Sequence, residues 1–484
     1  MRRLIFCFDG SWNKLDTKSY PTNVVLLAES VPPVDHKGVQ QIVYYDEGVG
    51  TASDETIRGG AFGKGLVQNI REAYRFLIFN HLAGDEIFVF GFSRGAFTAR
   101  SFIGFIRAIG ILKVNDANQI NEAWALYQKH AVRNSDTDDL LKFRARYCPD
   151  LCVNEAERDW RRANDGVVGT SEWPVLRIRY CGVWDTVGTL GWKAVSAVVD
   201  RRKDKTYDNH DTDLSDTVDA ARHAVALDER RIHFLPTLWR NVTELNARVG
   251  KADADADSPY QQKWFAGDHG SVGGGGPERG LSNAALHWVL RGAITQGLSI
   301  NLAGRSQLDD IRYNARAALH NTPQVGLGPG RIGIGAFRSI VGWVKDAALT
   351  AVRSGPTAMV DIHPSVLRRW FTKPEELPER RPYRPAALRG LIDRIQSERS
   401  VFAAPIDETI YPRHIVTEGE NLSVIARDRL GHGGRWQEIF EINRDVLDIE
   451  HDIFPGDELR LPPDARPSAV KNAPSAKSDA DPSS

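Results

Sequence analysis

A serine at the centre of a Gly-x-Ser-x-Gly pattern is the first candidate for chemistry in this chain. Ser93 lies in Gly91-Phe92-Ser93-Arg94-Gly95, after an apolar run (residues 85–90) and before apolar residues at helical spacing (residues 96–103). A strand, a sharp turn with serine at its tip and a helix together form a nucleophile elbow. The N-terminus of the helix favours negative charge that develops beside the serine. A purely structural turn is the alternative, because glycine and serine are common in turns.

A base and an acid are needed before a serine hydroxyl can act as a nucleophile. The best-placed candidates are Asp185, which follows the apolar run Tyr180–Trp184, and His269, which stands among glycines after the run Gln261–Phe265. The carboxyl ends of parallel strands share one edge of a sheet, so side chains that follow three strands can meet there. The chain order Ser93, Asp185, His269 is that of the α/β-hydrolase triad. The sequence therefore predicts a serine hydrolase.

Structural roles compete with catalytic ones at several positions. Asp185 could instead cap the helix that follows its strand. Asp268 is a rival acid, although a residue adjacent to His269 rarely points at the histidine ring. His223 is expected in the middle of a helix (Leu214 to about Leu227), where packed or surface histidines are common.

Two hydrogen-bond donors are needed to stabilise the oxyanion of a tetrahedral intermediate. One is expected to be the backbone N–H of Arg94, directly after the serine. The second is expected from the polar turn that follows the first apolar run, as the N–H of Gly10 or of Ser11. Asp9, at the start of this turn, would either order the turn or bind a cation.

Length and composition indicate a globular protein of two or three units. The 484 residues are 42% hydrophobic and 26% charged, and 62 basic residues balance 63 acidic ones. This balance argues against a general nucleic-acid-binding protein. The cysteines form no disulfide or zinc-binding pattern, so buried or free thiols in a reduced compartment are expected. We predict no cofactor and no metal.

The sequence shows no pattern typical of a signal peptide or of a transmembrane segment. The apolar run after Met1-Arg2-Arg3 is too short for a signal peptide, and no apolar stretch is long enough for a transmembrane segment. We therefore expect synthesis in the cytoplasm, with any export by a route that uses no cleaved signal.

Apolar runs alternate with helical patterns along the first 300 or so residues, which is typical of βα units and a mostly parallel sheet. Strands are expected at residues 4–8, 41–45, 85–90, 175–183, 234–239 and 261–265. Helices are expected at residues 22–30, 66–81, 96–103, 214–227 and 282–296. Between them, the charged helical stretch 120–146 and the irregular polar stretch 150–173 are expected to form an insertion over the sheet, a candidate lid.

Two further segments each allow two interpretations. Apolar residues from Phe337 to Val352 form an amphipathic helix pattern, with Arg338, Lys345 and Arg353 on its other faces. Such a helix would pack on the sheet or lie on a lipid surface. The alternating acidic loop at residues 252–257 is either solvated or a cation site.

Five ordered blocks resemble the uncharacterised α/β-hydrolase family typified by the first class of type VI secretion lipase effectors. These blocks, within about residues 1–300, are Phe8-Asp9-Gly10-Ser11-Trp12-Asn13, Gly91-Phe92-Ser93-Arg94-Gly95-Ala96, Gly182-Val183-Trp184-Asp185-Thr186-Val187-Gly188, Ala226-Leu227-Asp228-Glu229-Arg230-Arg231 and Trp264-Phe265-Ala266-Gly267-Asp268-His269-Gly270-Ser271-Val272-Gly273-Gly274-Gly275. The resemblance implies that Ser93, Asp185 and His269 are the triad and that the substrate is a phospholipid. A secretion-linked role would add an adaptor and an immunity protein as partners.

A second resemblance, to the LysM module, lies near the C-terminus. Its motifs are His414-Ile415-Val416-Thr417-Glu418-Gly419-Glu420-Asn421-Leu422, Trp436-Gln437-Glu438-Ile439 and Ile453-Phe454-Pro455-Gly456-Asp457. LysM modules bind N-acetylglucosamine in peptidoglycan or chitin. The resemblance places a glycan groove at Gly419, Glu420, Asn421, Leu422, Ile453, Phe454 and Pro455. A generic adaptor with little affinity for glycan is the alternative.

We thus predict an α/β-hydrolase-like domain (residues 1–385), a linker (386–412), a small βααβ LysM domain (413–463) and a disordered tail (464–484). The predicted function is a phospholipase-like serine ester hydrolase that LysM targets to cell-wall glycan. An esterase of polysaccharide or of other carboxylic esters, and an inactive envelope-binding scaffold, are the alternatives.

Overall fold

The computed structural model divides the chain into two compact units, Met1–Ala404 and Pro405–Ser484. It describes residues 1–10, 20–48, 61–130, 136–164, 173–188, 213–231, 234–255, 257–301, 313–320, 353–402, 411–417, 419–444, 447, 453 and 457–467.

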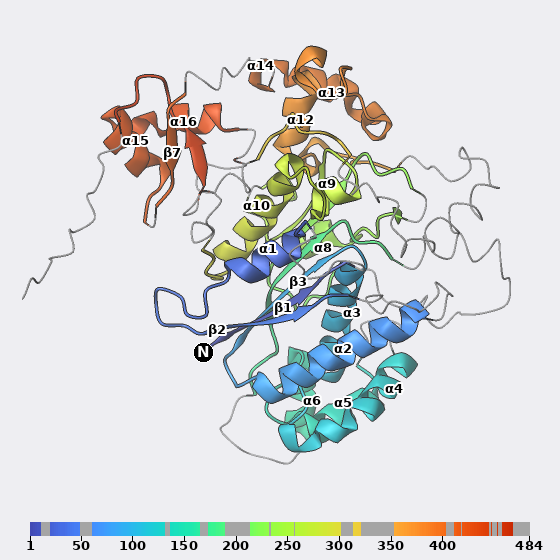
Figure 1. The fold of residues 1–484 in the computed structure, drawn as a ribbon. Coiled ribbons are helices and arrows are strands. Elements are labelled where there is room, and N and C mark those ends of the chain that lie inside the picture. The colour runs from blue at the N-terminus through green and yellow to red at the C-terminus, as the bar shows by residue number, and fades with distance from the viewer. Residues whose placement is uncertain are drawn as a thin grey trace, which may run out of the picture. The chain divides into compact units, whose positions relative to one another are not determined.

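A parallel sheet of six strands forms the centre of the first unit (Figure 1). The strands are β1 (Arg3–Phe8), β2 (Gln41–Asp46), β3 (Glu86–Phe92), β4 (Ile178–Trp184), β5 (Ala221–Ala226) and β6 (Tyr260–Phe265). They lie in the order β2-β1-β3-β4-β5-β6, and every neighbouring pair is parallel. The predicted α/β class is confirmed. Because β2 lies on one side of β1 and β3 on the other, the strand order reverses between β1 and β3.

Helices cover both faces of the sheet, which is why its strands are apolar along most of their length. Figure 1 shows α1 (Asn23–Ser30), α9 (His269–Gly273) and α10 (Gly280–Thr295) on one side, and α2 (Ala61–Asn80) and α3 (Arg94–Ile109) on the other. Side chains alternate between two cores accordingly. Phe6 and Phe8 of β1 pack with α2 and α3, whereas Ile5 and Cys7 pack with α1 and α10.

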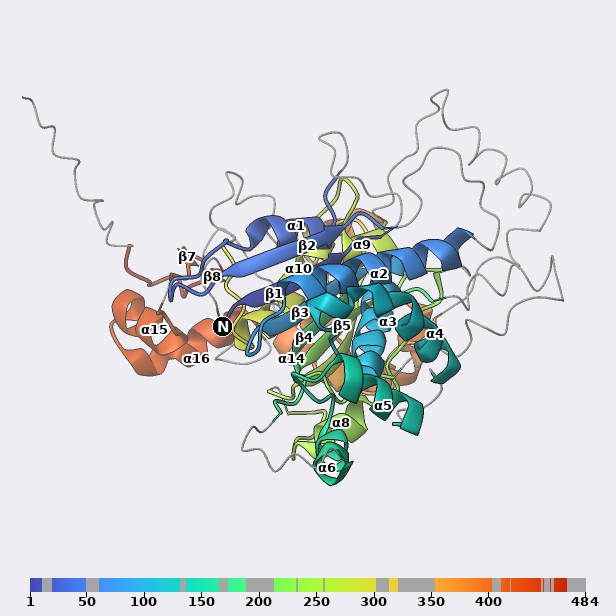
Figure 2. The same cartoon turned by 90° about the horizontal axis from the view of Figure 1, so that it is seen from below.

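Three more helices extend the layer formed by α2 and α3. They are α4 (Ile120–His130), α5 (Asp138–Tyr147) and α6 (Glu155–Asn164), and Figure 2 views the first unit from their side. Trp124 of α4 and Phe143 of α5 belong to the same buried core as α3. The segment that we considered as a lid is therefore a packed layer, and the prediction of irregular structure over residues 150–173 is wrong for α6.

A buried carboxylate explains why α6 forms in so polar a stretch. Glu157 is fully buried and forms ion pairs with Arg144 of α5 (2.9 Å) and with Arg161 one turn further along α6 (2.5 Å). Arg144 also donates to the carbonyl of Ala108 near the end of α3 (2.8 Å). These charged residues thus join three helices.

Two predicted elements between β4 and β6 are wrong. Residues 214–227 were expected as a helix, but Ala221–Ala226 forms β5, because a strand buried on both faces accepts alanine despite its helical preference. Residues 234–239 were expected as a strand, yet only Pro236 forms a bridge, to Val187. Proline lacks the N–H that a ladder requires.

The predicted linker at residues 386–412 is wrong in its first part. After α8 (Val242–Arg248), the first unit continues through α12 (Pro364–Phe371), α13 (Ile392–Ser397) and α14 (Arg399–Phe402). Leu388, Ile395 and Phe402 are buried in one core with Trp370 of α12 and Trp264 of β6. These apolar contacts extend the first unit to residue 404 rather than 385.

The second unit has the βααβ arrangement that the sequence predicts. Antiparallel strands β7 (Arg413–Ile415) and β8 (Glu458–Arg460) enclose α15 (Leu422–Leu430) and α16 (Trp436–Ile442). Its core contains Val416, Ile425, Ile439 and Leu461. Arg466 still contacts α15, because its N–H donates to the carbonyl of Arg429 (2.7 Å), so the first residues of the predicted tail 464–484 belong to this unit.

Several predicted features lie outside the described residues. They are Ser11, the amphipathic helix at residues 337–352, Phe454 and Pro455, and the tail from residue 468 onward. Arg353, expected on another face of that helix, is described and lies beside Asp185.

All four cysteines are free and buried, as expected.

Over the part of the chain that the structure describes, no single helix has both the length and the apolar character to cross a bilayer. Arg94–Ile109 and Val114–Lys129 meet that test only together, as a pair bent by 112°.

Substitution of Glu157 tests the buried ion-pair cluster. We expect Glu157→Gln to lower the free energy of unfolding by about 3 kcal/mol, because it leaves two guanidinium groups without their shared carboxylate. Denaturation followed by tryptophan fluorescence measures this. Asp159→Asn in the same helix is the control, since Asp159 is exposed and its removal should change stability by less than about 0.5 kcal/mol. Equal effects of the two variants would contradict the structural role of Glu157.

Candidate active site

Ser93 has the backbone conformation of a nucleophile elbow. It stands between β3 and α3 with φ 59° and ψ −123°. A positive φ is uncommon for a residue with a side chain. A Cβ atom on Gly91 would lie 2.5 Å from the carbonyl oxygen of Gly95, and one on Gly95 would lie 2.2 Å from that of Phe8. The turn therefore packs against itself and against the end of β1 so closely that both flanking positions require glycine.

The position of Ser93 in the sheet is one where ligands commonly bind. Ser93 follows β3 and Gly10 follows β1, the two strands between which the strand order reverses. In open parallel sheets, ligands bind at the carboxyl ends of the strands at such a point. The N–H of Ser93 donates to the carbonyl of Trp184 (3.0 Å), and the carbonyl of Ser93 accepts from the N–H of Val187 (3.3 Å). These bonds join the elbow to the segment that carries Asp185.

Asp185 directly follows β4 and is fully buried. It also has a positive φ, of 35°. Its Oδ2 lies 2.6 Å from Nδ1 of His269, and its Oδ1 accepts from the N–H of Ala226 (2.9 Å). Burial alone would raise the pKa of Asp185, but the Arg353 guanidinium and the hydrogen bond from His269 hold this pKa well below its ordinary value. The carboxylate is therefore ionised wherever the protein is folded near neutral pH.

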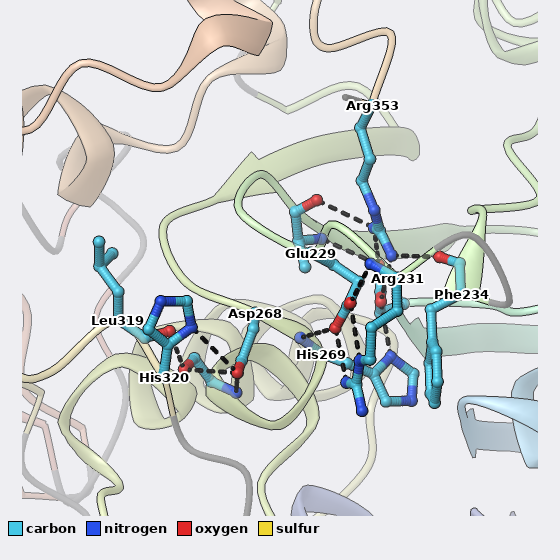
Figure 3. Close-up of polar contacts among 11 residues, drawn as sticks. Glu229, Arg231, Phe234, Asp268, His269, Leu319, His320 and Arg353 are labelled. Atoms are coloured by element: carbon cyan, nitrogen blue, oxygen red, sulfur yellow. Dashed lines mark hydrogen bonds and ion pairs between the residues drawn. The ribbon is translucent and has the colours of Figure 1, made fainter. Parts of the chain in front are cut away.

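Both the backbone and the side chain of His269 have partners, among them Glu229 (Figure 3). His269 is the first residue of the short helix α9, and its N–H donates to Glu229 (3.2 Å). Its ring packs against the rings of Phe92 and Phe234, with ring centroids 4.6 Å and 4.7 Å away. Phe92 immediately precedes Ser93, so this contact places the imidazole beside the elbow.

The rival acid Asp268 does not contact the ring of His269 through any bond that the structure gives. Asp268 is the N-cap of α9, where it accepts from the N–H of Ser271 (3.0 Å), and it also pairs with His320 (3.4 Å). Of the two candidate acids, Asp185 is the partner of the imidazole.

Arg353 is a part of the site that the sequence did not predict. Its side chain is almost fully buried and donates to both carboxylate oxygens of Asp185, at 2.5 Å and 3.0 Å. It also donates to the carbonyls of Ala226 (2.9 Å) and Phe234 (2.5 Å). The pattern around residue 353 suggested an amphipathic helix, and it held no signal that this arginine would reach a residue 168 positions earlier.

The structure describes two of the candidate oxyanion donors, the backbone N–H groups of Arg94 and Gly10. Arg94 is the first residue of α3, which puts its N–H at the start of the helix beside Ser93. The N–H of Gly10 donates to the side chain of Asp9 (2.6 Å). Asp9 is itself buried and accepts from the hydroxyls of Thr22 (2.7 Å) and Tyr45 (2.8 Å). The turn after β1 lies mostly outside the described residues, so the role of Asp9 in ordering it stays a prediction.

His223 is a buried strand residue, not the helical residue that we expected. It lies in β5, where Nε2 accepts from the N–H of Thr186 (3.2 Å) and Nδ1 lies 2.9 Å from Gln262 Oε1. Burial, together with the nearby Arg100, lowers the pKa of His223 to about 3. A neutral His223 therefore supports the backbone next to Asp185.

The predicted glycan residues that the structure describes lie around the start of α15. Gly419 has φ 82°, Asn421 caps α15 by accepting from Val424 N–H (2.9 Å), and Leu422 is buried. Glu420 accepts from the N–H of Thr417 (2.6 Å) and from His414 Nε2 (2.9 Å). Ile453 is buried with Leu422 in the core of the second unit.

Within the described ranges, no group of three or more histidine, cysteine or acidic side chains could hold a metal ion. In the acidic loop, Asp253 accepts from Asn246 (2.8 Å) and Asp257 pairs with Lys251 (2.5 Å).

Comparison with known families identifies the first unit. Residues 2–292 match the family described as "T6SS, Phospholipase effector Tle1-like, catalytic domain". The chain belongs to this Tle1-like family. The resemblance of the hydrolase blocks to this family, found in the sequence, is confirmed for residues 2–292.

Individual relatives are more distant. An uncharacterized protein of Saccharomyces cerevisiae, YEL023C, is 27% identical over 248 residues, which are 48% of this chain and 32% of the yeast protein. The chain thus spans about a third of that relative. A solved Tle1 effector bound to the VgrG spike of the type VI secretion system is 19% identical, with a TM-score of 0.30, over 56% of this chain and 51% of that one. An uncharacterized Pseudomonas aeruginosa protein is 15% identical, with a TM-score of 0.34, over 82% and 62% of the two chains.

The acid stability of the protein tests the buried state of His223. Histidine titrates near pH 6.5 in an unfolded chain. Between about pH 6.5 and pH 3, the unfolded chain thus binds a proton that folded His223 excludes, and stability falls as the pH falls. In His223→Gln we expect this slope to decrease by up to about 1.4 kcal/mol per pH unit. Unfolding measured at neutral and mildly acidic pH checks it, and an unchanged slope would show that His223 titrates normally.

Proposed function

We propose that the first unit is a serine ester hydrolase in which Ser93, His269 and Asp185 are nucleophile, base and acid. The observation that carries this proposal is the 2.6 Å contact between Asp185 and Nδ1 of an imidazole that packs against Phe92, the residue before Ser93. An ionised Asp185 fixes the proton on Nδ1 and leaves Nε2 as the acceptor. That nitrogen is the one that a base needs to accept a proton from serine.

The reaction proceeds in two halves. Nε2 of His269 accepts the hydroxyl proton of Ser93 as Oγ attacks the ester carbonyl, and the tetrahedral intermediate collapses with transfer of that proton to the leaving alcohol. Water then attacks the acyl-enzyme with the same base, which releases the carboxylic acid and restores Ser93. The backbone N–H of Arg94 stabilises the oxyanion in both halves, with help from the turn at Gly10 or Ser11.

A phospholipid is the proposed substrate, because the chain belongs to a phospholipase effector family. The same membership supports export through a type VI secretion system, with a spike or adaptor protein as the secretion partner and an immunity protein in the producing cell. An ester carried by a cell-wall polysaccharide is the competing substrate, since the second unit has the LysM-like βααβ arrangement.

The second unit is proposed to bind peptidoglycan or another N-acetylglucosamine glycan. Support comes from its βααβ order and from Gly419, Glu420 and Asn421, which lie together at the turn into α15. Phe454 and Pro455 would complete the groove.

Replacement of the nucleophile is the direct test of the mechanism. We expect Ser93→Ala to abolish both hydrolysis of a short acyl ester and labelling by a fluorophosphonate probe, because no other group supplies the attacking oxygen. Circular dichroism and thermal unfolding should match the wild type. Full activity in Ser93→Ala would refute the mechanism, and a wild-type protein that the probe never labels would favour the inactive scaffold. Fatty acid released from phospholipid vesicles, compared with acetate released from acetylated polysaccharide, distinguishes the two substrates.

Removal of the second unit tests the targeting role. We expect a chain of residues 1–404 to hydrolyse a short acyl ester at the wild-type rate, because the two units have separate cores. The same chain should no longer sediment with purified peptidoglycan, whereas the full chain should. Equal sedimentation of both proteins would refute glycan binding by the second unit.

A further inference from the structure

We propose that Arg353 is a positioning residue of the catalytic site, which holds Asp185 and the ring clamp of His269 in a single arrangement. This inference rests on the proposed function, because it concerns the same three catalytic groups. Nothing in the sequence motifs around Ser93, Asp185 or His269 includes Arg353.

The contacts of Arg353 reach both parts of this arrangement (Figure 3). Nη1 donates to Oδ1 of Asp185, and Nη2 donates to Oδ2, the oxygen that also faces His269. The same two nitrogens donate to the carbonyls of Ala226 and Phe234. A planar guanidinium supplies such a fork, whereas an ammonium group does not.

The bond to the carbonyl of Phe234 bears on the site because the ring of Phe234 contacts His269. That ring packs edge-on against His269 at 4.7 Å, and its face carries the Arg231 guanidinium at 3.9 Å. The N–H of Phe234 donates to the carbonyl of Arg231 (2.9 Å), and residues 234–239 form no regular strand. The bond from Arg353 connects the carboxylate that orients the imidazole with the backbone of a residue whose ring contacts the imidazole.

Charge gives Arg353 a second effect on the same groups. A carboxylate as buried as Asp185 would take up a proton without a compensating cation. Arg353 supplies that cation independently of the protonation state of His269. Asp185 therefore remains a hydrogen-bond acceptor for Nδ1 throughout the cycle, including the steps in which His269 is neutral.

Other charged groups surround the pair and bear on the expected titration. His223 of β5 is neutral at the pH of interest, because its pKa is lowered to about 3. Glu229 and Arg231, which follow β5, neutralise one another through a 2.6 Å ion pair, and Asp268 pairs with His320. Arg353 and His269 remain as the cationic partners of Asp185.

The test compares pH profiles of kcat/KM for a short acyl ester in matched arginine variants. In Arg353→Met we expect kcat to fall about 100-fold, because Asp185 and His269 are no longer held in the orientation that the reaction needs. We also expect the acid limb, which is the fall in kcat/KM at low pH, to move to higher pH by at least about one unit. The reason is that loss of the cation raises the proton affinity of Asp185 and of the adjacent imidazole. Arg353→Lys should restore the position of the acid limb but only part of the rate.

Arg369→Met is the structural control. Arg369 is equally buried and donates to the carbonyls of Ala315 (2.7 Å) and Ala317 (2.5 Å) and to Glu379 (2.6 Å), with no contact to the three catalytic groups among its described bonds. It should lower the thermal unfolding temperature and leave the acid limb in place. If Arg353→Met also leaves the limb in place, Arg353 has only a structural role and the proposal is wrong.

A second background keeps the test decisive if Arg353→Met does not fold. In Asp185→Asn no buried carboxylate needs the cation, so addition of Arg353→Met removes only the bonds to the carbonyls of Ala226 and Phe234 and should reduce the labelling rate of Ser93 by less than about 10-fold beyond Asp185→Asn alone. A further 100-fold loss would show that the main effect of Arg353 does not pass through Asp185. If the wild-type protein neither hydrolyses the ester nor reacts with the probe, the proposed function fails and this inference fails with it. If the wild-type protein is active and the acid limb of Arg353→Met does not move, the inference is wrong but the proposed function stands.

Discussion

The ionised carboxylate of Asp185, buried at the end of β4, is the constraint on which the rest of the site depends. A charge without water must find its hydrogen-bond partners in the protein, and each partner comes from a different part of the chain. Ala226 lies at the end of β5, His269 begins α9, and Arg353 precedes α12. The relative positions of these elements are therefore fixed by one side chain. Removal of any partner would leave a charge that the others cannot fully compensate.

Buried acids solve the same problem elsewhere in the first unit. Glu157 forms ion pairs with two arginines, which join helices α5 and α6. Asp9 accepts hydrogen bonds from two hydroxyls and a backbone N–H, among its partners.

The sequence predicted those features that depend on local pattern. Strands β1, β3 and β6 and the turn at Ser93 follow from apolar runs and from glycines at fixed spacing, and the family comparison confirms the hydrolase resemblance. The sequence failed where tertiary contacts override local preference. Alanines in β5 favour a helix until both faces of the strand are covered, and the polar sequence of α6 suggests irregular structure although Glu157 is buried in a helix. Arg353 could not have been found, because its function depends on a contact between residues far apart in the chain. The catalytic roles of Ser93, Asp185 and His269 stay predictions.

The four cysteines have a consequence for the environments in which this protein can work. All four thiols are buried, and burial raises the pKa of Cys152 to about 11 and that of Cys181 to about 12. Since the thiolate is the form that attacks disulfides and reacts with oxidants, these side chains are poor substrates for both reactions. The fold therefore contains no disulfide that must form before the protein is folded, and its thiols react slowly with oxidants. These thiols should stay unchanged when the protein passes from a reducing compartment to an oxidising one.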